Sequence, residues 1–387
     1  MENILRTLND ITVIPAVLSS IESRSECSPV YKNGMSPLFV SPMLNIINDE
    51  NFHCFLENKI NVVLPRDDER KPFQERFDRW RKYWNKVFVA LSLNEFKSCF
   101  DDMLGVNAKD IDEPIYVCID IANGHMKKLV DMCKRAKEKY GDKLIIMAGN
   151  IANPETYYEY AKAGIDYVRC GIGTGSICTT SANSSIHYPM ASLIEGCNAA
   201  KSSVKAWVGS SLTTEYKSVP KIIADGGFTN FDQIIKALAL GADYCMCGKL
   251  FAQCIEACTS MIADKDFQLP SEKDFWPDPP KHSTVRKPYD NVNFVLELMD
   301  KGYSFHRDYY GMSTKRAQKE MGGKGNKTAE GIAIQIEVHH TLAGWMDNFN
   351  SYLKSAMSYT DFRELEDFIG GPEHKYISPN SFIAYFK

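Results

Sequence analysis

The chain has 387 residues, of which 44% are hydrophobic and 24% are charged, a composition typical of a soluble globular protein. A net charge of -4 gives no general attraction to nucleic acid or to an anionic membrane surface. The sequence contains no stretch of about 18 apolar residues, so we expect no membrane span. The early charges in the N-terminal segment do not suit a signal peptide. Several of the twelve cysteines lie in apolar segments, so we expect reduced thiols and a cytoplasmic location.

Short apolar runs recur along the chain, most of them separated by segments with helical patterning. Nearly continuous hydrophobic runs are expected of strands that are buried on both faces of a parallel sheet. The predicted strands are Pro37–Met43, Ile60–Leu64, Val87–Leu93, Ile115–Ala122, Leu144–Asn150, Tyr167–Gly173, Lys221–Gly227 and Tyr244–Gly248. Eight strand–helix units predict an α/β fold of the TIM (β/α)8 barrel type, whose chemistry lies where the strands end.

The helical segments show an apolar side and ordinary capping signals. His125–Tyr140 places its apolar residues towards one side and its lysines on the other. Asn153 is a candidate cap for the following helix, and Gly164 a candidate stop. We expect one catalytic domain over residues 1–387, with insertions at about 202–220 and 264–303 and a flap at about 314–340.

The decapeptide GIGTGSICTT at residues 171–180 follows the short segment Tyr167–Cys170 and begins inside the sixth predicted strand. Its glycines allow positive φ and a close approach of the backbone to a ligand. Cys178 is a candidate nucleophile, and Thr180 is close enough in sequence to transfer a proton. Taken alone, a cysteine in an apolar context is more often structural. The decapeptide, however, resembles the catalytic loop of the IMP dehydrogenase/GMP reductase family, GIGPGS(V/I)CTT, with Thr174 in place of the proline.

Further motifs extend this resemblance over nearly the whole chain. They are SRSE at 23–26, SPM at 41–43, DIANG at 120–124, AGN at 148–150, ADGG at 224–227, YYGMS at 309–313, AEG at 329–331 and SAMSY at 355–359. DIANG, YYGMS and SAMSY are similar to the reductase pattern rather than to the dehydrogenase pattern. The order of the motifs on one barrel makes coincidence implausible.

The resemblance implies three groups of site residues. The catalytic residues are Cys178, Thr180 and Glu330. The substrate-binding residues are Ser41, Met43, Ser176, Asp225, Gly226, Gly227, Gly248, Lys249, Gly311, Met312, Ser313, Lys327 and Gly331. The cofactor-binding residues are Ser23, Arg24, Asp120, Ala122, Asn123, Asn150, Ile172, Ser355 and Ser358. Main-chain amides at tight turns suit a phosphate, and a carboxylate such as Asp225 can accept two ribose hydroxyl groups.

The activity that the resemblance implies is NADPH-dependent reductive deamination of a guanine nucleotide to IMP and ammonia, through a thioimidate on Cys178. It also implies a potassium ion on the carbonyl groups of Gly173, Gly175 and Cys178, a purine nucleoside monophosphate as ligand, and a homo-oligomer, by resemblance a tetramer. No regulatory CBS domain, nucleic acid or membrane is expected.

Several positions depart from the family pattern. Ser181 stands where arginine is usual, Leu44 where aspartate is usual, and Lys327 where arginine is usual. Pro65, with Arg66 beside it, stands near the position of a lysine. Lys249 replaces a glycine or serine and either adds a charge to the phosphate site or points to solvent. The alternatives are therefore an IMP dehydrogenase-type oxidation with NAD and a catalytically inactive nucleotide-binding barrel.

Overall fold

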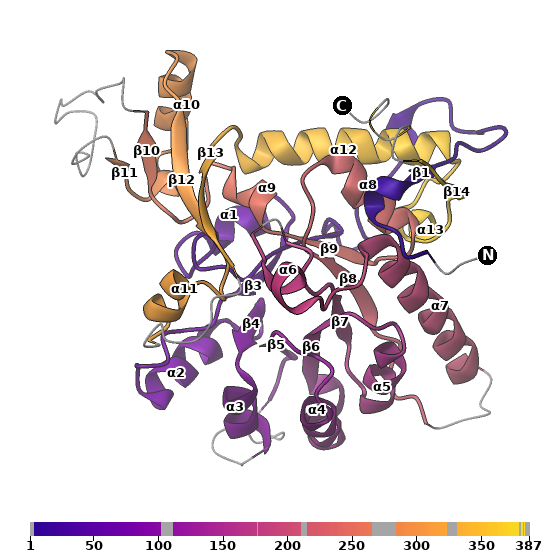
Figure 1. The fold of residues 1–387 in the computed structure, drawn as a ribbon, viewed down its shortest axis with the longest axis horizontal. Helices are drawn as coiled ribbons and strands as arrows, with labels where there is room; N and C mark the ends of the chain where they lie inside the picture. The colour runs from indigo at the N-terminus through magenta and orange to yellow at the C-terminus, as the bar shows by residue number, and fades with distance from the viewer. Residues whose placement is uncertain are drawn as a thin grey trace.

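Eight parallel strands close into a barrel in which each strand pairs with its neighbour in sequence and β9 pairs with β2. The computed structural model describes residues 4–101, 111–175, 177–209, 215–264, 284–322, 331–378, 381 and 383. The barrel strands are β2 (Leu38–Val40), β3 (Asn61–Leu64), β4 (Phe88–Leu91), β5 (Ile115–Asp120), β6 (Leu144–Ile151), β7 (Tyr167–Cys170), β8 (Lys221–Asp225) and β9 (Tyr244–Cys247). Each predicted strand overlaps one of these, so the TIM-barrel prediction is confirmed (Figure 1).

Alternation along the strands fills the barrel in layers, because successive side chains of a strand point to opposite faces. Aromatic side chains of several strands meet inside the barrel. The ring centroids of Phe39 and Phe88 are 5.8 Å apart, and those of Phe88 and Tyr167 are 5.3 Å apart. Arg169 lies two residues after Tyr167 in β7, so its side chain also points into the barrel. Polar side chains therefore occupy the upper layer of the barrel.

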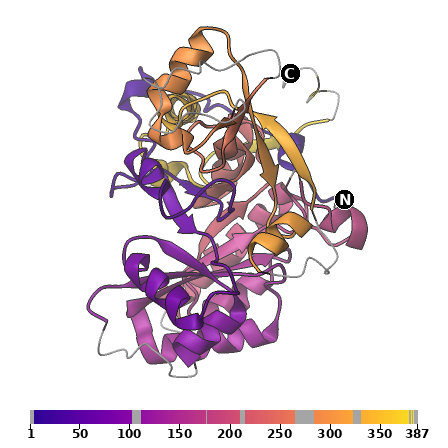
Figure 2. The ribbon, with the colours of Figure 1, turned by 90° about the vertical axis from the view of Figure 1, so that its left-hand side faces the viewer.

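Helices surround the barrel in the order that the sequence predicts (Figures 1 and 2). They are α1 (Phe52–Glu57), α2 (Phe73–Tyr83), α3 (Leu93–Phe96), α4 (Lys127–Tyr140), α5 (Thr156–Ala163), α6 (Thr180–Ser184), α7 (Met190–Gly209), α8 (Phe231–Ala239) and α9 (Lys249–Ala252). Helix α4 buries Leu129, Met132 and Cys133 as its patterning predicts. Gly164 ends α5 in the left-handed conformation, whereas Asn153 lies outside the helix and accepts a hydrogen bond from the Glu155 amide.

A second sheet stands beside the barrel and carries part of its upper rim. Its strands follow the order β11-β10-β12-β13 and are antiparallel. The elements are β10 (Met261–Ala263), β11 (Thr284–Val285), α10 (Val292–Asp300), β12 (Phe305–Tyr310), α11 (Lys315–Glu320) and β13 (Ala333–Glu337). Strand β12 ends immediately before Gly311, so the sheet positions the segment Gly311-Met312-Ser313 at the barrel.

The two ends of the described chain meet. Strand β1 (Ile11–Val13) pairs with β14 (His374–Tyr376), and the long helix α12 (Leu342–Tyr359) packs against α8 outside the barrel, along the top of the view in Figure 1. The remaining elements are α13 (Leu365–Phe368) and the short turns η1 (Leu8–Asp10), η2 (Arg24–Glu26), η3 (Lys97–Asp101), η5 (Gly141–Lys143) and η6 (Pro288–Asp290). None of the described helices is long and apolar enough to cross a membrane.

The segments predicted as insertions contain regular structure. The range 202–220 begins inside α7, which continues to Gly209, so its polar start is the last part of a helix whose polar residues are mostly exposed. Within 264–303 the described part forms β11, η6 and α10, while 265–283 lie outside the described residues. The predicted flap, 314–340, includes α11 and β13, with 323–330 outside the described residues.

Candidate active site

A cavity of about 350 Å³ opens at the carboxyl ends of the barrel strands. Asp120 ends β5, Asp225 ends β8, and Gly171 and Gly248 directly follow β7 and β9. Predicted site residues that line the cavity are Ser41, Met43, Asp120, Ala122, Asn150, Ile172, Gly173, Gly175, Cys178, Thr180, Asp225, Gly226, Gly227, Gly248, Lys249, Gly311, Met312 and Ser313. Residues from six different strand ends thus converge, which is where chemistry occurs in this fold.

Cys178 presents its thiol to this cavity. Ten of the twelve free cysteines are buried, and Cys178 and Cys258 are half-buried, but only Cys178 lines the cavity. Its thiol donates to the Thr180 hydroxyl at 3.3 Å between Sγ and Oγ1. Its backbone pairs with Gly331, and the Ile332 amide donates to the Ile177 carbonyl at 3.0 Å. An accessible thiol beside a hydroxyl is the pairing that a covalent mechanism needs.

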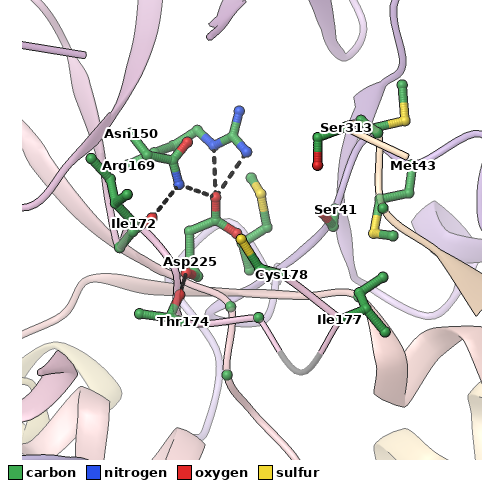
Figure 3. Close-up of a pocket in the computed structure, with 18 of the residues that line it drawn as sticks. Ser41, Met43, Asn150, Arg169, Ile172, Thr174, Ile177, Cys178, Asp225 and Ser313 are labelled. Atoms are coloured by element: carbon green, nitrogen blue, oxygen red, sulfur yellow. Dashed lines mark hydrogen bonds and ion pairs between the residues drawn. The ribbon is translucent and has the colours of Figure 1, made fainter. Parts of the chain in front are cut away.

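A buried polar network holds Asp225 beside the cysteine loop (Figure 3). Its Oδ2 accepts hydrogen bonds from Arg169 Nε at 3.0 Å, Arg169 Nη2 at 2.8 Å and Asn150 Nδ2 at 2.7 Å. These donors satisfy one carboxylate oxygen. Among the described residues no hydrogen bond reaches Oδ1, so this oxygen can accept donors from a ligand in the cavity.

Arg169 also reaches the second acidic residue of the cavity. Its Nη1 donates to Asp120 Oδ1 at 2.7 Å, and Arg66 Nε lies 3.8 Å from Asp120 Oδ2. Burial raises the pKa of Asp120, but the guanidinium groups of Arg169 and Arg66 outweigh it and hold this pKa below the usual aspartate value. Asp120 is therefore an anion with two cationic neighbours.

The opposite end of the cavity suits a phosphate group. Gly226, Gly227 and Gly248 bring main-chain groups to the surface of the cavity without side chains. Lys249 is half-buried and lines the cavity. Within the part of the chain that the structure describes, no carboxylate forms an ion pair with it. A cation is thus available beside the glycine turns.

Comparison with known proteins agrees with this geometry. The model of the IMP dehydrogenase / GMP reductase domain matches residues 83–271, which contain Cys178 and Asp225. Over this range the chain is similar to the IMP dehydrogenase/GMP reductase family. A GMP reductase of Staphylococcus aureus strain JH9 is 26% identical over 364 residues, covering 92% of each chain. A GMP reductase of Buchnera aphidicola subsp. Schizaphis graminum is 28% identical over 303 residues, covering 75% of this chain and 70% of the relative.

The cofactor residues that the family resemblance implies fall into three places. Asp120, Ala122, Asn150 and Ile172 line the cavity. Asn123 does not line it, because its Oδ1 accepts the His125 amide in the turn after β5. The other four gather where η2 meets α12, away from the lining of the cavity: Ser23, Arg24, Ser355 and Ser358. There Arg24 Nη1 donates to Ser355 Oγ at 3.3 Å.

Three predicted residues, Ser176, Lys327 and Glu330, lie outside the described residues. Gly331, which follows Glu330 in the chain, is described and pairs with Cys178, although it does not line the cavity. The roles of all four residues stay predictions.

The carbonyl groups predicted as potassium ligands already take part in the hydrogen bonds of this loop. Of the carbonyl groups predicted as ligands, that of Gly173 accepts the Ser181 hydroxyl at 3.2 Å and that of Gly175 accepts the Cys178 amide at 3.0 Å. Two of the three predicted ligand oxygens therefore already have protein donors.

Sequence reasoning missed Arg169 and the part played by Thr174. Arg169 is a charged residue in the otherwise apolar run Tyr167–Cys170, and its parity with Tyr167 points it inward. A charge at an inward position of a buried strand needs a counter-ion, and this was the available signal. Nothing in the sequence indicated the hydrogen bond that Thr174 makes to the Asp225 carbonyl.

Proposed function

We propose that the chain is a GMP reductase-like oxidoreductase that deaminates a guanine nucleotide reductively, with NADPH as the reductant. The observation that carries the proposal is the cavity in which the thiol of Cys178, bonded to Thr180 at 3.3 Å, shares one space with Asp225. The similarity to GMP reductases over most of the chain supports it. The proposal includes a single catalytic domain over residues 1–387, a homotetramer and a cytoplasmic location, each on the strength of the family resemblance.

In this proposal the nucleotide lies across the cavity. The free oxygen of Asp225 accepts the ribose hydroxyl groups, because its other oxygen is already satisfied by Arg169 and Asn150. The phosphate lies at the turns of Gly227 and Gly248, with Lys249 beside them. The purine lies towards Ser41, Met43 and Ser313, which Figure 3 shows on the side of the cavity away from Arg169. Met312, which precedes Ser313, lines the same cavity.

The chemistry begins at C2 of the purine. The Cys178 thiolate adds to C2, and the amino group leaves as ammonia after receiving a proton. Thr180 is placed to pass that proton because its hydroxyl already meets Cys178 Sγ, and we assign Glu330 as its partner from the sequence alone. The product of this step is a thioimidate, in which C2 is bonded to the sulfur of Cys178 and can accept a hydride. When C2 has been reduced, the carbon–sulfur bond breaks, the thiolate is restored and IMP is released.

The cofactor supplies the hydride that reduces C2. The residues suited to hold its nicotinamide end are Asp120 and Asn150, which line the cavity next to Ile172. Asp120 can accept hydroxyl donors because it is ionised, and Arg169 fixes its orientation at 2.7 Å. A hydride step also needs water to be kept from C2, since water would hydrolyse the covalent adduct instead.

A covalent trap tests this proposal. Incubation with GMP and no cofactor should attach the purine nucleotide to the peptide that carries Cys178, with release of ammonia, and mass spectrometry should locate it. Cys178→Ser should remain unmodified, and Cys258→Ser, which removes the other half-buried thiol, should react like the wild type. Absence of the adduct under conditions in which GMP is bound would refute the covalent mechanism.

A further inference from the structure

Two residues by which this chain departs from the family loop both donate hydrogen bonds to main-chain carbonyls. The first is Thr174, whose hydroxyl donates to the Asp225 carbonyl at 2.9 Å. Proline, the family residue at this position, has no side-chain donor and could not make this bond. The contact joins the cysteine loop to the turn after β8. A Cβ on Gly227, which has φ +84, would lie 2.9 Å from the Thr174 carbonyl oxygen, so the two segments touch directly.

The second residue is Ser181, at the position where the family carries arginine. Its hydroxyl donates to the Gly173 carbonyl at 3.2 Å across eight residues of chain. The two residues are in close contact, since a Cβ on Gly173 would lie 2.9 Å from the Ser181 Cβ. Gly173 has φ +73, a conformation that glycine adopts without strain. Ser181 thus lies against Gly173 and donates to the carbonyl that the resemblance assigns to a cation.

The turn between these two contacts leads to the reactive thiol. The Cys178 amide donates to the Gly175 carbonyl at 3.0 Å, and Cys178 follows the turn directly. Thr174 bonds the loop to the turn after β8, and Ser181 bonds the Gly173 carbonyl. The Cys178 amide bonds the Gly175 carbonyl within the loop. A hydroxyl donor and a monovalent cation satisfy a carbonyl oxygen in the same sense, by placing positive charge at its lone pairs.

We propose that Thr174 and Ser181 are positioning residues that hold the cysteine loop by their hydroxyl groups, in the role that a bound monovalent cation would otherwise fill. The loop is therefore ordered equally well with and without potassium. The proposal takes Cys178 as the reacting thiol from the proposed function, but the ordering of the loop is measured without any reaction.

Hydrogen exchange of the peptide covering residues 171–181 tests the proposal, measured in potassium chloride, sodium chloride and N-methylglucamine chloride at equal ionic strength. We expect the wild-type peptide to exchange at the same rate in all three salts. Ser181→Ala and Thr174→Val should exchange roughly 2- to 10-fold faster in N-methylglucamine, the change that loss of one hydrogen bond gives. Potassium should slow the Ser181→Ala peptide again, because the Gly173 carbonyl is then free for the ion.

Ser181→Thr and Thr174→Ser keep the hydroxyl groups and should behave like the wild type. The strand peptide 144–151 serves as an internal control for unfolding. If the strand peptide also exchanges faster in a variant, that variant is partly unfolded. The test then depends only on the exchange of the wild-type protein in the three salts. Slower exchange of the wild-type loop in potassium than in N-methylglucamine, by fivefold or more, would overturn the proposal, and so would a Ser181→Ala loop that exchanges like the wild type. Either outcome leaves the reductase reaction itself untouched, since no turnover is measured.

Discussion

Arg169 donates two hydrogen bonds to a single carboxylate oxygen of Asp225, from Nε at 3.0 Å and from Nη2 at 2.8 Å. The same guanidinium reaches Asp120 at 2.7 Å, so one buried cation serves two anions from two different strands. Burial lowers the pKa of Arg169, but these carboxylates raise it well above its ordinary value. The upper layer of the barrel is thus fixed electrostatically before any ligand enters.

Replacement of Arg169 should destabilise the protein strongly. Arg169→Met leaves Asp225 without its buried counter-ion and Asp120 with Arg66 alone, and we expect a loss of about 3–5 kcal/mol in the free energy of unfolding. Chemical denaturation measures this loss. The double variant Arg169→Met, Asp225→Asn should recover part of the stability but not nucleotide affinity. A single variant as stable as the wild type would show that the network carries no net stabilisation.

The acid side of the stability curve should depend on Asp120. Because Arg169 and Arg66 lower the pKa of Asp120 in the folded state, its ionised form stabilises the fold above the unfolded-state pKa of about 3.9. This contribution is lost as the pH falls through the lower, folded-state pKa. We therefore expect Asp120→Asn to be less stable than the wild type near neutral pH and the difference to shrink on acidification. A difference that is independent of pH would contradict the ion-pair account.

Lys249 should contribute to affinity for the phosphate group. Lys249→Gln should weaken binding of GMP by about 1–2 kcal/mol, the value of a charge-assisted contact, and should leave guanosine binding unchanged. Calorimetry with both ligands measures the difference. Lys128→Gln, on the exposed face of α4, is the matched control and should change neither affinity. If Lys249→Gln lowers the affinities for GMP and guanosine equally, Lys249 does not contact the phosphate group.

Glu330 should act in the transition state rather than in binding. Glu330→Gln should abolish ammonia release while changing nucleotide affinity little, the pattern of a group that is needed only during reaction. Ammonia assays and equilibrium binding on the same preparation separate the two effects. Loss of nucleotide affinity in parallel with loss of turnover would instead assign Glu330 to ground-state binding.

The barrel could be predicted from the sequence because its strands are short, continuous apolar runs, and most of them are bounded by polar or glycine clusters. The same clusters predicted which strand ends carry the site, and most of the implied residues line one cavity. The sequence could not show that η2 and α12 bring Ser23, Arg24, Ser355 and Ser358 together, since this depends on how a long C-terminal helix packs across the barrel. The predicted insertion 202–220 begins inside α7, because the polar residues at its start lie on the exposed face of that helix.

The two acidic partners of Arg169 could not be predicted from the sequence, because they too depend on the packing of the whole fold. Which strand neighbours meet inside a barrel depends on the register, and the register is set by packing of the whole barrel. In the structure Arg169 pairs across β6 with Asp120 of β5 and across one strand boundary with Asp225 of β8. No local pattern around Arg169 indicates both partners.

The most direct test of the account is turnover of the wild-type protein with two pairs of substrates. With GMP and NADPH we expect NADPH oxidation that is matched by IMP and ammonia, and a fall of about three orders of magnitude or more in Cys178→Ala, because the nucleophile is lost. With IMP and NAD we expect no steady formation of NADH. Robust IMP oxidation, or GMP-dependent turnover that survives in Cys178→Ala, would contradict the reductase account.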